Sequence, residues 1–214
     1  MMKRIEIVSL SSGVLGEAFV QHELEIGLRR LQSYGAEVFF SSHALCGLDY
    51  LQQHPEARAA DLLEALQGNA DMILCAIGGD DTYRLLPYLW EDDALLRAAE
   101  KGKDKIFLGF SDSTMNHLML HKVGMRTFYG QSFLADICEL EDDMLPYTKK
   151  FFEEFKKFDT ENLLPKRGFI YFFLSKQGSE GRKKIAVITR YVALVLAIIQ
   201  AIAIVISIDI VKPE

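Results

Sequence analysis

The chain has 214 residues, of which half are apolar, and it carries a formal net charge of −6 and three cysteines. This length and apolar share allow a sizeable hydrophobic core, and the acidic balance gives no basic face for a nucleic-acid partner. The cysteines, Cys46, Cys75 and Cys138, show no C-x-x-C or Cys/His ligand spacing. We therefore expect no disulfide framework, no metal site and a reducing compartment. We also expect no cofactor. The apolar segment near the amino terminus is too short for a signal-peptide core, so we predict a cytoplasmic location.

Strands and helices alternate through the first half of the chain. Apolar runs predict strands at residues 3–10, 36–40, 71–77 and 106–108, with one more short strand within 126–133, and helical spacing predicts helices at residues 17–31, 56–66, 83–89 and 92–101. This alternation predicts an α/β fold with a doubly wound parallel sheet and a ligand site at the carboxyl ends of its strands. Three loops should meet there, at residues 9–13, 78–82 and 109–114.

Two segments after these strands have a distinct composition. Residues 136–143 are acidic, and we interpret them as a solvated surface. Residues 144–158 carry phenylalanines at helical spacing, which predicts an amphipathic helix that packs against the sheet or a neighbour.

Ser111 stands between the strand at 106–108 and a predicted helix that begins at the polar residues after it. A serine at such a turn lies over the free N–H groups of the helix, which favour an oxyanion. The arrangement is that of a nucleophile elbow, although the sequence G-F-S-D differs from G-x-S-x-G. The alternative is a helix-capping serine without chemistry.

Three carboxylates stand at the ends of two of these strands, namely Asp80, Asp81 and Asp112. Each could cap a helix, orient a loop or contact a substrate amine. The turn that begins at Gly78 and Gly79 also resembles the G-G-D-G-T phosphate-binding turn of NAD and diacylglycerol kinases, because paired glycines let backbone N–H groups approach phosphate. Here Asp81 replaces the third glycine and adds negative charge.

The residues near Ser111 in sequence supply no general base. His117 and His121 lie one turn apart on the predicted helix, roughly 9 to 15 Å along its axis from Ser111, which is beyond hydrogen-bond reach. We expect packing or surface roles for both.

Three segments resemble the LD-carboxypeptidase family of serine peptidases, and within it the microcin C immunity branch. They are VSLSSGVLGE at residues 8–17, AIGGDDTYRLLPYL at 76–89 and FLGFSDSTMNHLMLHKVGMRTFYGQSFL at 107–134. The resemblance covers residues 3–158 and implies that Ser111 is the nucleophile and that the backbone N–H groups of Gly79 and Asp112 form the oxyanion hole. It also implies a peptide or peptidyl-nucleotide substrate and a homodimer. Gly78, Asp80 and Asp81 are the substrate-binding candidates.

The family's second domain, which supplies a glutamate and a histidine to the catalytic triad, has no counterpart that we find in this chain. Residues 169–208 instead resemble a loop and a helix of SecY, the translocon channel subunit. We interpret residues 1–158 as the amino-terminal domain, 159–168 as a junction and 169–214 as the SecY-like part of a chimera.

The uncharged run at residues 191–208 has 18 residues, the lower end of the length that spans a bilayer. It predicts membrane contact, with a buried helix or strand as the alternative.

These features lead to three hypotheses about function. The first is a serine peptidase of the LD-carboxypeptidase type, truncated and of low or no activity because the Glu and His are absent. The second is a phosphate- or nucleotide-binding domain that uses the G-G-D-D-T turn. The third is a non-enzymatic, membrane-tethered or fused fragment.

Overall fold

A computed structural model describes residues 3–155 and shows a five-stranded sheet in which every strand pair is parallel. The strand order is β2-β1-β3-β4-β5, so the chain reverses its winding direction at β1. The predicted parallel sheet is confirmed. Its strands are β1 (Lys3–Val8), β2 (Ala36–Phe40), β3 (Met72–Cys75), β4 (Ile106–Gly109) and β5 (Phe128–Tyr129).

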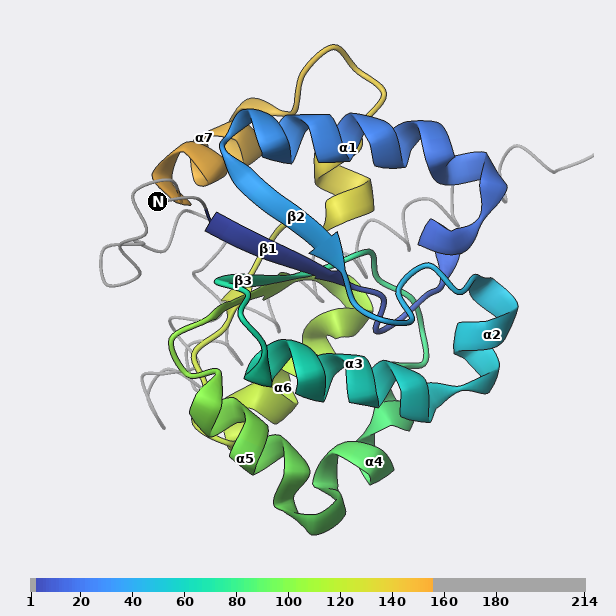
Figure 1. Cartoon of the computed structure of the whole chain (residues 1–214), viewed down its shortest axis with the longest axis vertical. Helices are drawn as coiled ribbons and strands as arrows, with labels where there is room; N and C mark the ends of the chain where they lie inside the picture. Colours follow the sequence, from blue (N-terminus) through green and yellow to red (C-terminus); the bar gives the residue numbers. More distant parts are fainter. Residues whose placement is uncertain (1–2, 156–214) are drawn as a thin grey trace, which may run out of the picture. The chain divides into compact units, whose positions relative to one another are not determined.

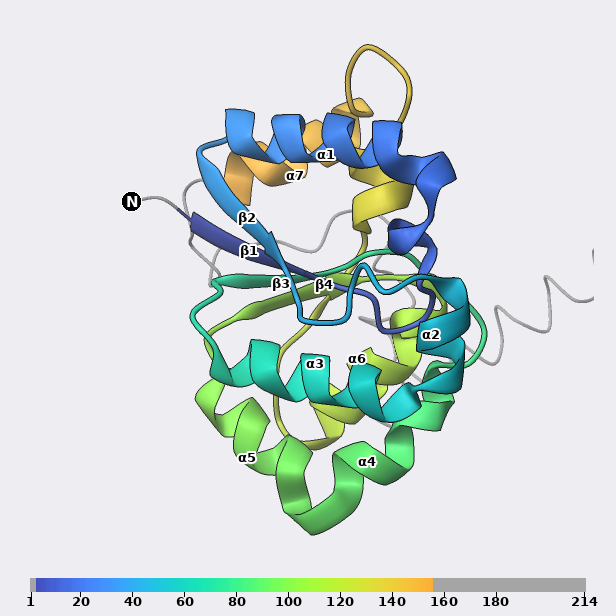
Figure 2. The same cartoon turned by 45° about the vertical axis from the view of Figure 1, so that its right-hand side comes forward.

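Helices cover both faces of the sheet. Helices α1 and α7 lie on one side, and α3, α4, α5 and α6 lie on the other (Figures 1 and 2). The doubly wound arrangement is therefore confirmed. The helices are α1 (Gln21–Ser33), α2 (Leu48–Gln53), α3 (Pro55–Gln67), α4 (Leu86–Trp90), α5 (Ala94–Lys101), α6 (Thr114–Lys122) and α7 (Pro146–Phe155).

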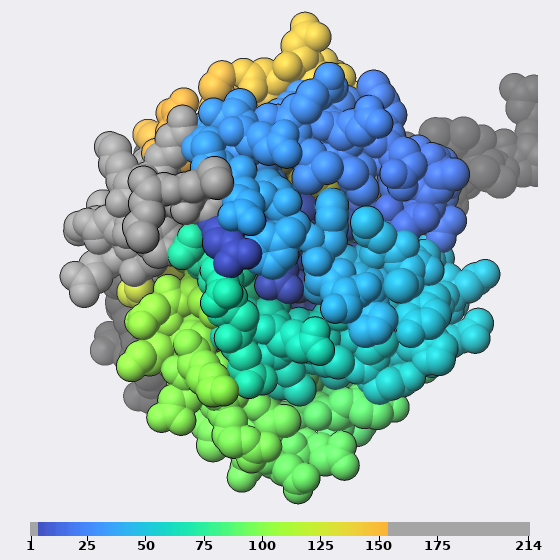
Figure 3. Space-filling view, viewed as in Figure 1, coloured from blue at the N-terminus to red at the C-terminus, as the bar shows by residue number. Residues whose placement is uncertain are grey.

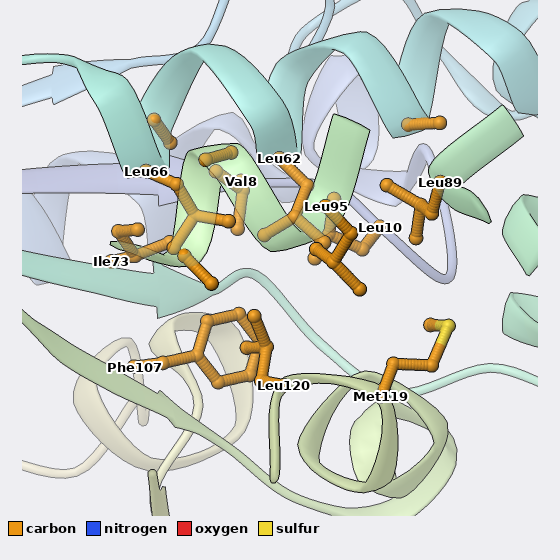
Figure 4. Packing of buried hydrophobic residues seen from close by; sticks show 14 of the residues in the cluster. Val8, Leu10, Leu62, Leu66, Ile73, Leu89, Leu95, Phe107, Met119 and Leu120 are labelled. Carbon is orange, nitrogen blue, oxygen red and sulfur yellow. The ribbon is translucent and has the colours of Figure 1, made fainter. Parts of the chain in front are cut away.

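The hydrophobic core lies between the sheet and the helices that cover its α3 face. Strands β3 and β4 are buried along their whole length, as expected for the centre of a parallel sheet. Side chains from α3, α5 and α6 meet those of the strands there, and Figure 4 labels Leu62, Leu66, Leu95 and Leu120 beside Val8, Ile73 and Phe107. In the space-filling view, only a small area of β1 is visible between β2 and α3 (Figure 3).

Several helix boundaries differ from the prediction. The helix predicted at 17–31 begins at Gln21, because two 3-10 turns, Val14–Gly16 and Ala18–Val20, precede it. The helix predicted at 83–89 divides into a 3-10 turn, Thr82–Leu85, and α4.

The acidic stretch at 136–143 is only partly the solvated surface that we predicted. The Asp136 carboxylate is half-buried and accepts the Ser132 N–H at 2.8 Å. Arg30 of α1 donates to the backbone carbonyls of Ile137 and Glu139, both at 2.8 Å, which ties the stretch to α1. Residues 141–143 are exposed, as expected.

The predicted junction at 159–168, the SecY-like segment at 169–208 and the apolar run at 191–208 lie outside the described residues. Within residues 3–155, no helix is both long enough and apolar enough to cross a membrane.

Candidate active site

Ser111 occupies a sharp corner between β4 and α6. Phe110 is extended, and Ser111 then has a φ of +63°. This value lies in the left-handed region, which residues other than glycine rarely adopt. A 3-10 turn, Ser111–Ser113, leads from this corner into α6. The turn that the sequence predicted is confirmed, and the Ser111 side chain at its apex is exposed. A strained residue with an exposed hydroxyl between strand and helix is the geometry of a nucleophile elbow.

The backbone of this corner is held from the β5 side. The Ser111 N–H donates to the Tyr129 hydroxyl at 3.0 Å, and the Gly130 N–H donates to the Gly109 carbonyl at the same distance. His117 Nε2 also donates to the Gly109 carbonyl, at 3.0 Å. The corner is thus fixed by side chains from α6 and β5, and we did not foresee the role of Tyr129.

Gly78 lies directly against Ser111. A Cβ atom added to Gly78 would be 2.8 Å from the Ser111 Cβ and 2.9 Å from its Oγ, so the approach requires glycine. Gly79 is similarly packed on Ser11, whose carbonyl oxygen would be 2.8 Å from an added Cβ. In the part of the chain that the structure describes, neither the Gly79 nor the Asp112 N–H donates a hydrogen bond. Two unpaired backbone donors therefore stand on segments adjoining the serine.

Thr82 joins the three loops at the carboxyl edge of the sheet. Its N–H donates to the Asp112 carboxylate at 3.0 Å and its hydroxyl donates to the same oxygen. The hydroxyls of Thr82 and Ser11 are 2.6 Å apart, and both residues are buried. The prediction that the loops at 9–13, 78–82 and 109–114 meet is confirmed, and the Asp112 side chain serves to connect two of them.

Asp81 is bound within the protein. Arg58 of α3 holds both of its oxygens, at 2.6 Å and 3.1 Å, and Arg84 donates to it at 3.1 Å. Burial alone would raise the pKa of the Asp81 carboxyl, but the two guanidinium groups outweigh it and hold that pKa below its ordinary value. Asp80 is exposed and has no partner among the described residues. Of the three carboxylates, only Asp80 is free to meet a ligand.

The described histidines do not supply a base to Ser111. His117 is buried, its ring stands edge-on to Phe107 with centroids 5.0 Å apart, and its Nε2 is bound to the Gly109 carbonyl. Burial lowers the pKa of His117 to about 4, which the hydrogen bond to the Gly109 carbonyl only partly offsets. The predicted packing role of His117 is confirmed. His43, after β2, pairs with Asp61 of α3 at 2.8 Å.

The fold and this corner define the chain as an α/β protein in which a strand-turn-helix junction exposes a serine beside a double-glycine turn. A family model described as the LD-carboxypeptidase N-terminal domain matches residues 5–130, which is more than half of the chain. The chain belongs to the LD-carboxypeptidase family.

Known relatives agree with this assignment. The probable murein peptide carboxypeptidase of Bacillus subtilis (strain 168) is 32% identical over 149 residues, which are 67% of this chain and 44% of that protein. An MccF-like protein from Streptococcus pneumoniae, solved in complex with AMP, is 57% identical with a TM-score of 0.70, over 76% of this chain and 46% of that one. The microcin C7 self immunity protein MccF, solved with aspartyl sulfamoyl adenosine, is 24% identical with a TM-score of 0.57, over 76% of this chain and 45% of that one, and shows likeness of fold alone.

The chain spans less than half the length of these relatives. The family model ends at residue 130, so it gives no support to the resemblance of residues 169–208 to SecY.

Proposed function

We propose that residues 3–155 form the nucleophile-bearing half of a serine peptidase of the LD-carboxypeptidase type. The observation that carries this proposal is the exposed Ser111 at a φ of +63°. Gly78 is in close contact with Ser111. The N–H groups of Gly79 and Asp112, which donate no hydrogen bond within residues 3–155, belong to the residues next to Gly78 and Ser111 in sequence. Ser111 Oγ would attack the carbonyl carbon of an amide, and those two N–H groups would stabilise the oxyanion that forms.

The reaction needs a base that the described residues do not offer to Ser111. The base takes the Ser111 hydroxyl proton as the Oγ–carbon bond forms, and that proton passes to the leaving nitrogen as the carbon–nitrogen bond breaks. Water then hydrolyses the acyl-enzyme. A second domain with a glutamate and a histidine would supply this base, so we propose that this chain alone has low or no activity.

The proposed substrate is a peptide or a peptidyl nucleotide. The Bacillus subtilis relative is named for murein peptides, and MccF was solved with an aminoacyl sulfamoyl nucleoside. The proposed cleavage is at an amide near the carboxyl terminus of a murein peptide, or at the corresponding amide of a peptidyl-nucleotide antibiotic. Asp80, which has no partner within residues 3–155, is the candidate contact for a substrate amine. A cytoplasmic location and a homodimer remain part of this proposal.

The test is turnover by the full chain. The protein is incubated with a murein tetrapeptide, and separately with aspartyl sulfamoyl adenosine, and the products are followed by mass spectrometry. We expect little or no product from either. Turnover that disappears in Ser111→Ala would disprove the proposed inactivity and support Ser111 as nucleophile.

A fluorophosphonate tests the nucleophile separately, because Ser111 Oγ can displace its fluoride as a phosphorus–oxygen bond forms and the hydroxyl proton goes to solvent. We expect slow labelling at Ser111. Absence of this label, or turnover that survives in Ser111→Ala, would exclude the proposed role.

Nucleotide binding through the G-G-D-D-T turn is a second candidate, favoured by the AMP in the Streptococcus pneumoniae protein. The Asp81 charge is already paired with Arg58 and Arg84. Stabilisation of the chain by AMP in a thermal melt, with Gly79→Val as the comparison, would support it. A non-enzymatic membrane-tethered fragment would instead be recovered with membranes on fractionation.

A further inference from the structure

Tyr129 reaches the candidate nucleophile from the neighbouring strand. In the parallel ladder, Tyr129 of β5 lies opposite Gly109 of β4, two residues before Ser111. The Gly130 N–H donates to the Gly109 carbonyl at 3.0 Å, which fixes the register at this point. From there the Tyr129 hydroxyl accepts the Ser111 N–H at 3.0 Å.

This bond gives the Ser111 N–H an acceptor at a residue whose backbone is strained. Ser111 lies two residues beyond Gly109, the last residue of β4, so its N–H is outside the ladder, and in residues 3–155 the phenol oxygen is its acceptor. Left-handed residues other than glycine persist only where their surroundings hold them. Tyr129 therefore contributes to holding the elbow in this conformation.

The Tyr129 ring is itself fixed. It lies against the His117 ring with centroids 5.4 Å apart, and His117 is bound through Nε2 to the Gly109 carbonyl. A side chain with two rotatable bonds and a packed ring loses little entropy when it makes a hydrogen bond. Tyr129 as a whole residue is 50% exposed, and Ser111 is exposed as well.

We infer that Tyr129 is a positioning residue for Ser111, an inference that rests on the proposed function of that serine. By accepting the Ser111 N–H, the phenol oxygen fixes the peptide between Phe110 and Ser111. The Ser111 Cα, which carries Oγ and leads to the Asp112 N–H, is attached to that peptide, so fixing the peptide restricts the directions of both groups. The phenol keeps its own proton for a second hydrogen bond, because the bond to Ser111 uses a lone pair.

Tyr129→Phe tests this inference, because it retains the ring against His117 and removes only the acceptor. Tyr147→Phe is the matched control, since Tyr147 is an exposed tyrosine of α7, 57% accessible. Three quantities are compared in the full chain. They are the hydrogen exchange rate of the Ser111 amide by NMR, the rate of fluorophosphonate labelling by intact mass, and the thermal midpoint.

We expect Tyr129→Phe to speed exchange of the Ser111 amide and to slow labelling by about fivefold, the factor set by the net worth of one hydrogen bond. The thermal midpoint should fall by no more than about 2–4 °C relative to Tyr147→Phe, the shift that the loss of one such hydrogen bond produces, whereas a purely structural role would lower the midpoint and leave the labelling rate unchanged. Wild-type amide exchange or a wild-type labelling rate in Tyr129→Phe would overturn the inference. If wild-type Ser111 is not labelled at all, the proposed nucleophile fails, and the amide exchange still decides whether Tyr129 holds the elbow.

Discussion

The pair between Arg58 and Asp81 offers the sharpest test of how this site is held together. The Arg58 side chain is 1% exposed, and its guanidinium donates to both oxygens of Asp81, at 2.6 Å and 3.1 Å. It also donates to the Leu10 carbonyl at 3.2 Å. One buried cation from α3 therefore joins the loop after β1 to the loop after β3.

We predict that Asp81→Ala lowers the free energy of unfolding by roughly 3–5 kcal/mol, the cost of leaving one partner of a buried ion pair without the other. The whole free energy of unfolding of a protein is typically about 5–15 kcal/mol, so this loss is large. With a urea dependence of about 1–3 kcal/mol per molar, the midpoint of urea unfolding should fall by at least about 1 M.

The pH dependence of this loss has a definite sign. Burial of the Asp81 carboxyl opposes ionisation, but Arg58 and Arg84 hold its pKa below the ordinary value. A carboxyl with a lowered pKa stabilises the fold at pH values above its unfolded pKa of about 4, and this contribution disappears as the pH falls through the folded value. The difference in free energy of unfolding between wild type and Asp81→Ala should therefore have its full size at pH 7 and become smaller below about pH 4.

The assay is urea unfolding followed by circular dichroism at pH 7 and at pH 3. The control is Asp143→Ala, because Asp143 pairs with Lys149 where both side chains are largely exposed, and no shift of the midpoint is expected there. The double variant Arg58→Met/Asp81→Ala should be more stable than Asp81→Ala, since no charge then remains buried. The reasoning is refuted if Asp81→Ala has the same urea midpoint as the wild type. It is also refuted if the double variant loses as much free energy of unfolding as Asp81→Ala and Arg58→Met lose together when each is made alone.

Three further predictions concern other residues. His117 has a pKa of about 4 in the fold, so the fold should lose up to roughly 3 kcal/mol as the pH falls from about 6.5 to 4, and His117→Asn should flatten that slope in urea unfolding; an unchanged slope would contradict the assignment. Ser111→Gly should raise the free energy of unfolding by about 1 kcal/mol, because glycine adopts a φ of +63° without strain; a loss of stability would show that the Ser111 side chain holds the turn. In the native protein, iodoacetamide should modify exposed Cys46 and spare buried Cys75 and Cys138, because burial raises the pKa of both buried thiols to about 12; a peptide map that shows a second adduct would contradict this.

The parallel sheet could be predicted because its signals are local. Runs of buried residues such as those of β3 and β4, alternating with helical spacing, exclude most other folds. The start of α1 could not be predicted, because Gly13 and Gly16 pack on the backbone of Gly47, where the chain forms the 3-10 turns Val14–Gly16 and Ala18–Val20. That contact joins segments about 30 residues apart in sequence, and no local pattern reports it.

The site divides in the same way. The turn at Ser111 and the glycine pair beside it are visible as short polar and glycine-rich segments after apolar runs. Arg58 left one signal that we did not use: it lies four residues before Leu62 and eight before Leu66, on the buried stripe of α3 where a charged residue requires a partner. The sequence contains no comparable signal for the role of Tyr129, since a half-exposed tyrosine on a two-residue strand is compatible with any surface role.

The side chains around Ser111 explain why the corner can be rigid and still lack a base. The Asp112 carboxylate is bound to Thr82, His117 is bound to the Gly109 carbonyl, and the Tyr129 oxygen is bound to the Ser111 N–H. Within the described residues, each of these three groups thus has a partner other than the serine hydroxyl, and none acts on that hydroxyl. A neutral histidine with a pKa of about 4 is also a poor proton acceptor near pH 7. The exposed side of Ser111 is therefore where a base from outside residues 3–155 would have to approach.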